Sequence, residues 1–120
     1  LCGITATPPN KEITKTAIGA TDSVEWTYYK QTIDAITDLK EKGYVIVAIE
    51  QTDSSVDLLD FRFQDDKYAI ILGNEVNGVT TDVLPSVDYA IEIAQYGTKH
   101  SLNVSVCGGI VLHHFANNLR

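Results

Sequence analysis

The apolar residues of this chain fall into short, nearly unbroken runs that alternate with amphipathic stretches. Runs of this kind are typical of strands that are covered on both faces, as in a parallel sheet. They predict three buried strands, at residues 44–49, 68–72 and 89–93. A short strand is also expected at residues 1–4, and aromatic and β-branched content predicts another at residues 24–29.

The amphipathic stretches between these runs predict helices. Residues 31–42 place apolar side chains on one stripe and charged ones opposite, and Gly43 follows where a left-handed C-cap belongs. The stripe consists of Ile33, Ile36 and Leu39. Shorter helices are expected at residues 11–18 and 56–61. Strands that alternate with helices predict a one-domain α/β fold, with a mostly parallel sheet flanked by helices.

The last helix is predicted over residues 101–118, with Ser101 in a position that suits an N-cap. Its apolar stripe consists of Val104, Cys107, Val111 and Phe115. Gly108 and Gly109 interrupt this helix, and each glycine costs about 1 kcal/mol relative to alanine. A helix tolerates that cost where another backbone passes very close, so we expect a close approach at these two glycines.

Composition favours an ordinary soluble globular domain, because apolar residues make up 44% of the chain and charged residues 21%. No apolar run approaches the roughly eighteen residues of a membrane helix, and the first residues do not resemble a signal peptide. Cys2 and Cys107 lack metal-ligand spacing, so two reduced, buried thiols in a cytoplasmic protein without a metal site are expected. The chain contains no methionine and opens on a predicted strand, which indicates a fragment of a longer protein.

The net charge of −7 argues, taken alone, against a nucleic-acid partner, which usually requires a basic face. The charge is uneven, however, since Lys11, Lys15 and Lys99 lie in predicted loops or near them. The acids gather between residues 53 and 66, where a solvated surface is the simplest interpretation. These acids are Asp53, Asp57, Asp60, Asp65 and Asp66. Composition therefore lowers the expectation of RNA binding without closing it.

Two unusual segments follow predicted strands, at the edge of a parallel sheet where ligands gather. The first runs from Gly73 to Val79 and has the glycine spacing of a phosphate loop. Val79 replaces the lysine that such a loop needs, which argues against a nucleoside-triphosphate site. On this motif alone, a ligand-binding segment and an ordinary strand-to-helix turn, in which Asn74 and Glu75 cap the next segment, are equally good interpretations. The second, residues 94–100, follows the strand predicted at residues 89–93 and contains Gly97. Together with the end of that strand and the sequence SLNVSV that follows, it makes up residues 91–106.

Together these segments resemble RNA methyltransferases of the SpoU/TrmH family, within the SPOUT superfamily. GNEVNGV, at residues 73–79, is similar to the second motif of that family, and residues 91–106 are similar to the third. Residues 4–26 resemble the family as well, so the likeness spans essentially the whole chain. The sequence departs from the family pattern at Ala94, where proline is usual, and at Cys107, where alanine is usual.

The resemblance implies a C-terminal trefoil knot, a homodimer whose RNA site draws on both subunits, and S-adenosyl-L-methionine as cofactor. The implied activity is methyl transfer to RNA, with a ribose 2′-hydroxyl of tRNA or rRNA as the expected acceptor. The matching cofactor positions are Leu72, Gly73, Asn74, Gly78, Ile93, Gly97 and Leu102. The positions tied to the catalytic centre are Glu75, Ser101 and Asn103.

These catalytic positions also have purely structural interpretations. Ser101 is equally well explained as a plain helix cap, Asn103 could be a loop clamp, and His100 is better explained as an exposed loop residue than as a base. In the family, an arginine in the first motif is thought to activate the ribose hydroxyl, and that motif precedes the segment that Leu1 begins. Neither Arg62 nor Arg120 has a matching context, so the chain is expected to lack the N-terminal strand and helix of the domain.

Two other classes of protein stay open. The first is a non-catalytic knotted module for RNA binding or dimerisation that retains the cofactor pocket. The second is an unrelated small α/β domain of the flavodoxin or response-regulator kind. That second class needs an acidic cluster or a flavin phosphate loop after its first strand, and residues 5–9 offer neither.

Overall fold

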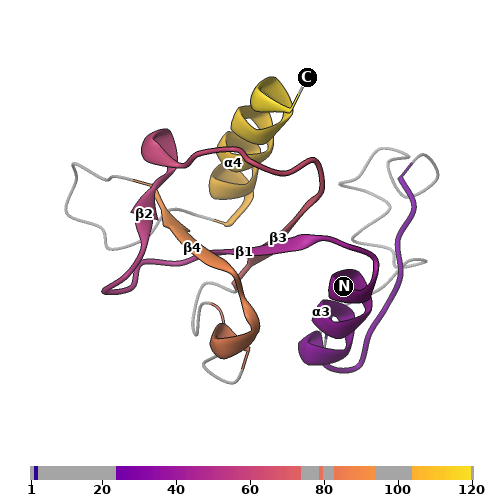
Figure 1. The fold of residues 1–120 in the computed structure, drawn as a ribbon. Helices are drawn as coiled ribbons and strands as arrows, with labels where there is room; N and C mark the ends of the chain where they lie inside the picture. Colours follow the sequence, from indigo (N-terminus) through magenta and orange to yellow (C-terminus); the bar gives the residue numbers. More distant parts are fainter. Residues whose placement is uncertain (1, 3–23, 74–78, 80–82, 94–103, 120) are drawn as a thin grey trace. The chain divides into compact units, whose positions relative to one another are not determined.

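The computed structural model describes residues 2, 24–73, 79, 83–93 and 104–119 (Figure 1). The chain divides into two units, residues 1–38 and residues 39–120, which are described separately. The predicted helix at residues 11–18 lies outside the described residues, as does most of the strand predicted at residues 1–4.

Helix α3 (Thr32–Glu41) confirms the first helix predicted from the apolar stripe. Within that stripe Ile36 is buried, and Ile33 and Leu39 are partly buried. The helix ends as expected at Gly43, whose φ of 88° lies in the left-handed region. The Gly43 amide donates to the Lys40 carbonyl and the Tyr44 amide to the Leu39 carbonyl, which satisfies the last turn of the helix.

The strand predicted at residues 24–29 is wrong. Only Tyr29 forms a β-bridge, parallel to Cys2, and residues 24–28 belong to no strand. All five of those residues are exposed, and Val24 is 65% exposed. Because strand propensity reflects packing on a half-buried sheet surface, aromatic and β-branched residues without such a surface do not form a ladder.

The predicted sheet is confirmed in residues 39–120, and every pairing among its described strands is parallel. The strands lie in the order β2-β4-β1-β3. Their bounds are Val45–Ile49 for β1, Val56–Asp57 for β2, Tyr68–Leu72 for β3 and Tyr89–Glu92 for β4. Three consecutive residues of β1, Ile46 to Ala48, are fully buried. Successive side chains point to opposite faces, so β1 is covered on both.

Helix α4 (Val104–Asn118) covers one face of this sheet (Figure 1). Its residues Val111 and Phe115 join one core cluster with residues of β1 and β4 and with the segment that follows β2. The cluster consists of Val47, Leu58, Phe61, Ile91, Val111 and Phe115. The predicted stripe of the last helix is therefore confirmed, with Cys107 packed against the cluster and Val104 partly buried.

The short helix predicted at residues 56–61 is only partly right. Val56 and Asp57 instead form the two-residue strand β2, because they pair with Ile91 and Glu92 of β4. A 3₁₀ turn, Leu58–Asp60, follows. The Asp57 side chain caps that turn by accepting a hydrogen bond from the Leu59 amide at 2.9 Å.

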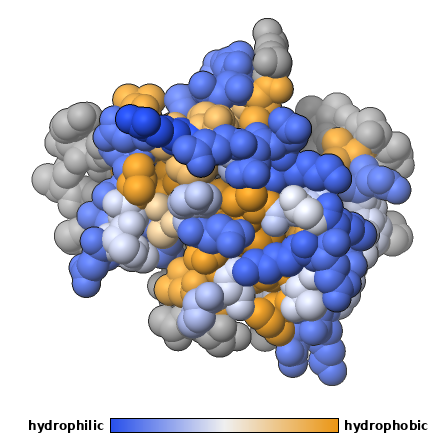
Figure 2. All heavy atoms as spheres, in the orientation of Figure 1, coloured by the Kyte–Doolittle hydropathy of each residue, from blue (hydrophilic) through white to orange (hydrophobic). Residues whose placement is uncertain are grey.

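The surface of the described residues is largely hydrophilic on the face shown in Figure 2, with apolar side chains reaching it in places. Four of the predicted solvated acids are exposed, namely Asp53, Asp60, Asp65 and Asp66, whereas Asp57 is partly buried. Both cysteines are free but only partly buried, so the expectation of buried thiols is too strong. Among the described helices, none has the length and apolar character to cross a membrane.

Candidate functional site

The two unusual segments leave the sheet at the same edge. Leu72 ends β3 and is followed by Gly73, and β4 ends one residue before Ile93. Strand β1 lies between them, because Ile49 pairs in register with both Leu72 and Ile91. Leu72 is 39% exposed, and Gly73 and Ile93 are partly buried. Three predicted site residues are thus brought to one edge of the sheet, on either side of its central strand.

The other predicted site residues lie outside the part of the chain that the structure describes. They are Asn74, Glu75, Gly78, Gly97, Ser101, Leu102 and Asn103.

Helix α4 lies close to the end of β3 at Gly108. A Cβ atom on this buried glycine would lie 3.2 Å from Cδ1 of Leu72, tighter than ordinary side-chain packing. The prediction for Gly108 is therefore partly right: a close approach is present, but the neighbouring group is the Leu72 side chain and not a backbone. At Gly109 the structure shows no such approach, since that residue is exposed and a Cβ there would meet nothing within 4 Å among the described residues.

Glu50, directly after β1, connects this edge to the segment that follows β3. Its backbone amide donates to the Ile91 carbonyl at 3.0 Å, which continues the ladder with β4. Its carboxylate Oε2 accepts a hydrogen bond from the Val79 amide at 2.8 Å. Sequence reasoning did not single out Glu50, although an acid at the end of a buried apolar strand is a recognisable signal for a group at the ligand-binding edge.

A second carboxylate at the same edge fixes the turn between β1 and β2. Glu92 Oε1 lies 3.1 Å from the Ser55 hydroxyl, which also lies 2.8 Å from the Thr52 carbonyl oxygen. The same hydroxyl oxygen accepts a hydrogen bond from the Thr52 amide at 3.2 Å. Glu92 therefore fixes the turn of residues 52–55 beside the end of β4.

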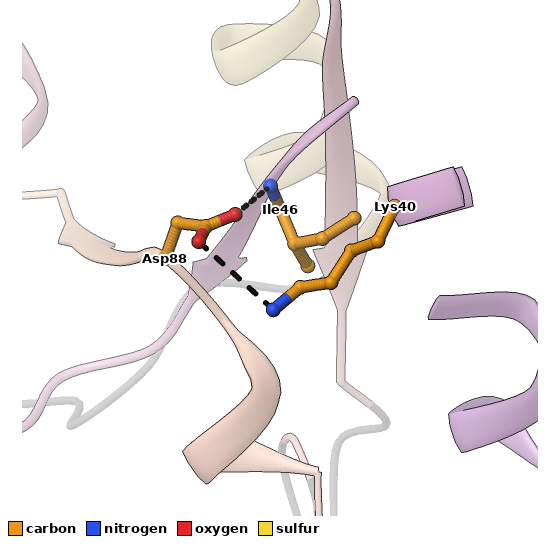
Figure 3. A network of polar contacts seen from close by, with 3 residues as sticks. All are labelled: Lys40, Ile46 and Asp88. Carbon is orange, nitrogen blue, oxygen red and sulfur yellow. Dashed lines mark hydrogen bonds and ion pairs between the residues drawn. The ribbon is translucent and has the colours of Figure 1, made fainter. Parts of the chain in front are cut away.

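A third carboxylate also accepts a hydrogen bond from a neighbouring segment, at the opposite, amino edge of the sheet (Figure 3). Asp88 precedes β4, and its Oδ2 accepts a hydrogen bond from the Ile46 amide at 2.8 Å. The Asp88 amide donates in return to the Ile46 carbonyl. The Lys40 ammonium lies 4.0 Å from Oδ1, and both side chains are 41% exposed. Solvent screens such a pair, so the backbone hydrogen bonds carry most of the connection.

The chemistry available from the described side chains is limited. Burial raises the pKa of the Cys107 thiol, which favours the protonated and unreactive form. Within the described ranges, no three His, Cys, Asp or Glu side chains gather as metal ligands would. What these ranges provide at the carboxyl edge of the sheet is an exposed apolar side chain, a glycine and two carboxylates that accept hydrogen bonds from neighbouring segments.

Comparison with known proteins connects this edge to a family. Residues 2–113 match the SpoU rRNA Methylase family. The chain is 33% identical over 103 residues to a tRNA (guanosine(18)-2′-O)-methyltransferase from Borreliella burgdorferi, covering 86% of this chain and 47% of that protein. The chain thus spans less than half the length of this curated relative.

Solved structures agree in fold. The TrmH/SpoU tRNA modifying enzyme of A. aeolicus superposes with a TM-score of 0.78 at 30% identity, over 98% of this chain and 57% of that one. An AdoMet-bound rRNA methyltransferase from Sinorhizobium meliloti gives a TM-score of 0.90 at 24% identity, over 100% of this chain and 45% of that one. With a family match over nearly its whole length and a sheet of the same architecture, this chain belongs to the SpoU rRNA methylase family.

Proposed function

We propose that this chain is the cofactor-binding part of an S-adenosyl-L-methionine-dependent RNA methyltransferase, which methylates a ribose 2′-hydroxyl of tRNA or rRNA. The observation that carries the proposal is the convergence of Leu72, Gly73 and Ile93 at one edge of the sheet, on either side of β1. Family membership supports it, as do the relatives named as tRNA 2′-O-methyltransferases. The same membership argues against a flavodoxin-like or response-regulator-like protein.

The described residues fit S-adenosyl-L-methionine. Leu72 and Ile93 bring backbone groups to the carboxyl edge of the sheet, and Gly73 lets a ligand approach the backbone without a Cβ in the way. In this proposal Leu72, Gly73, Ile93 and Leu102 hold the cofactor, and Asn74, Gly78 and Gly97 shape the surrounding segments. The bound cofactor supplies an electrophilic methyl group on a sulfonium sulfur.

The remaining polar residues act on the acceptor. Transfer requires the ribose oxygen to lie in line with the methyl group, and its proton must be removed. We assign Glu75 and Asn103 to positioning the acceptor and the neighbouring segments. We assign to Ser101 the hydrogen-bonding role that its position before the last helix suggests. No metal ion takes part in this scheme.

The proposal includes the knot and the homodimer expected for the family. The contact between Leu72 and Gly108 supports the knot, because it packs α4 against the end of a strand that leads into the cofactor segment. Exposed apolar side chains on α4 support self-association, since such residues on a helix surface favour a protein partner. These are Val106, Ile110 and Leu112, between 40% and 59% exposed. A cytoplasmic location completes the proposal.

Isothermal titration calorimetry with S-adenosyl-L-methionine tests the proposal directly. We expect saturable heat and a rise in melting temperature with increasing cofactor, because a ligand that binds only the folded state stabilises it. The absence of both at millimolar cofactor would overturn the proposal. Methyl transfer to tRNA or rRNA is assayed after the upstream residues with their arginine are restored. A protein that binds the cofactor and still transfers no methyl group would instead be a non-catalytic knotted module.

A further inference from the structure

We propose that Glu50 is a positioning residue of the cofactor site, whose carboxylate fixes the far end of the glycine segment that follows β3. This role rests on the function proposed above and assigns to that site a residue outside its two sequence motifs. It concerns how the site is held in shape, since no contact between Glu50 and the cofactor is required.

The position of Glu50 in the sheet suits this role. It follows β1, which lies between β3 and β4 in the strand order. Ile49, one residue earlier, pairs with Leu72 on one side and with Ile91 on the other. Glu50 therefore stands between the two strands whose ends carry the described cofactor residues. Its own backbone is held in place by the hydrogen bond from its amide to the Ile91 carbonyl.

The contact with Val79 is of a kind that is costly to lose. A carboxylate that accepts from a backbone amide forms a charge-assisted hydrogen bond, about twice as strong as a neutral one. The bond here is 2.8 Å long, and Val79 is only 6% exposed. Removing the acceptor leaves an amide beside a buried side chain without its partner, and the backbone must shift to satisfy it.

The consequence falls on the segment between Gly73 and Val79. Gly73 is held at one end, because it directly follows Leu72 in the ladder of β3. Val79 is held at the other end by Glu50. The family resemblance assigns cofactor positions to Gly73, Asn74 and Gly78. In the sequence these residues all lie between the end of β3 and Val79. Loss of the second anchor should therefore change cofactor affinity more than it changes the sheet.

The chain offers a matched control in Asp88. Its carboxylate also accepts a hydrogen bond from a backbone amide, that of Ile46, at the same distance of 2.8 Å. Asp88 precedes β4 and so acts at the amino edge of the sheet, away from the ends of β3 and β4. Glu50→Ala and Asp88→Ala thus each remove one carboxylate-to-amide bond, at opposite edges of one sheet.

The experiment compares the unchanged protein with Glu50→Ala, Glu50→Gln and Asp88→Ala, using calorimetric titration with S-adenosyl-L-methionine and thermal unfolding. We expect Glu50→Ala to raise the dissociation constant about tenfold, which corresponds to a loss of about 1.4 kcal/mol of binding free energy. Glu50→Gln keeps an acceptor oxygen, so its affinity for the cofactor should lie between those of the unchanged protein and Glu50→Ala. Asp88→Ala should lose thermal stability but keep the affinity of the unchanged protein.

The outcomes separate this role from the proposed function. If the unchanged protein does not bind the cofactor, the proposed function fails and the role of Glu50 fails with it. If it binds and Glu50→Ala binds equally well, only the role of Glu50 is overturned. Equal weakening by Glu50→Ala and Asp88→Ala would also overturn it, because the effect would then reflect general destabilisation. Hydrogen exchange at the Val79 amide should accelerate in Glu50→Ala and not in Asp88→Ala.

Discussion

Leu72 and Gly108 meet so closely that a single additional carbon on Gly108 would lie 3.2 Å from Cδ1 of Leu72. Leu72 ends β3, and Gly108 lies in the first half of α4. The glycine therefore lets the last helix approach the strand end that leads into the proposed cofactor segment. The Leu72 side chain is 39% exposed, so it can turn outwards if the space is filled.

The adjacent glycines allow a matched test of this contact. Gly109→Ala should raise the free energy of unfolding by about 1 kcal/mol, because alanine is the better helix former and meets nothing within 4 Å. Gly108→Ala gains the same helix propensity but must displace Leu72, so its net gain should be clearly smaller. Chemical denaturation measures both, and equal gains would show that the Leu72 contact imposes no constraint. Displaced Leu72 should also weaken cofactor binding in Gly108→Ala alone.

Phe115 is expected to be a large contributor to stability. The centroid of its ring lies 4.9 Å from the ring centroid of Phe63, 5.4 Å from that of Tyr68 and 5.8 Å from that of Phe61. The residue is 3% exposed. Phe115→Ala should cost about 3–5 kcal/mol, because it leaves a cavity in addition to losing buried area. That is a large share of the stability of a small domain. The control is Leu59→Ala, since Leu59 is 79% exposed and should change the unfolding free energy by less than about 0.5 kcal/mol.

The strands β1, β3 and β4 could be predicted because each contains a continuous apolar run. Their burial was predicted correctly only for β1, since β3 is partly buried with Leu72 exposed, and Ile91 is the one buried residue of β4. Helix α3 could be predicted equally well, because its apolar stripe indicates where the helix lies and Gly43 indicates where it ends. The strand expected at residues 24–29 failed because composition does not reveal whether a packing surface exists. Likewise Val56 and Asp57 suit a helix locally, but pairing with β4 makes them a strand.

Of the site, the placement of Leu72, Gly73 and Ile93 at one edge could be predicted, because strand ends of a parallel sheet share that edge. The contact of Glu50 with Val79 could not, since it joins residues 29 apart through a side-chain-to-backbone hydrogen bond. No periodic pattern in a sequence encodes such a pairing. The contact of Gly108 with Leu72 could not be predicted for the same reason, because a glycine indicates a close approach without indicating which residue approaches.

Because the pKa of the Cys107 thiol is raised, the free energy of unfolding should change with pH in the alkaline range. Burial disfavours the thiolate, so between the unfolded and folded pKa values the folded protein binds more protons than the unfolded one. Stability is therefore fully present below the unfolded pKa and falls as pH rises from about 8.5 through the folded value. Cys107→Ala should reduce that fall, measured as melting temperature against pH. An identical alkaline slope in both proteins would assign it to other groups.

The proposed homodimer should depend on Val106 and Ile110, which lie one helical turn apart on α4 and are 53% and 40% exposed. We expect Ile110→Glu to shift the protein from dimer to monomer in sedimentation velocity, because two like charges would meet across a two-fold interface. The domain itself should remain folded, since the substitution adds no charge to the core cluster. The matched control is Leu59→Glu, since Leu59 is an even more exposed apolar residue outside α4, and no change in sedimentation is expected. A dimer that persists in Ile110→Glu, with unchanged concentration dependence, would place the subunit contact elsewhere on the chain.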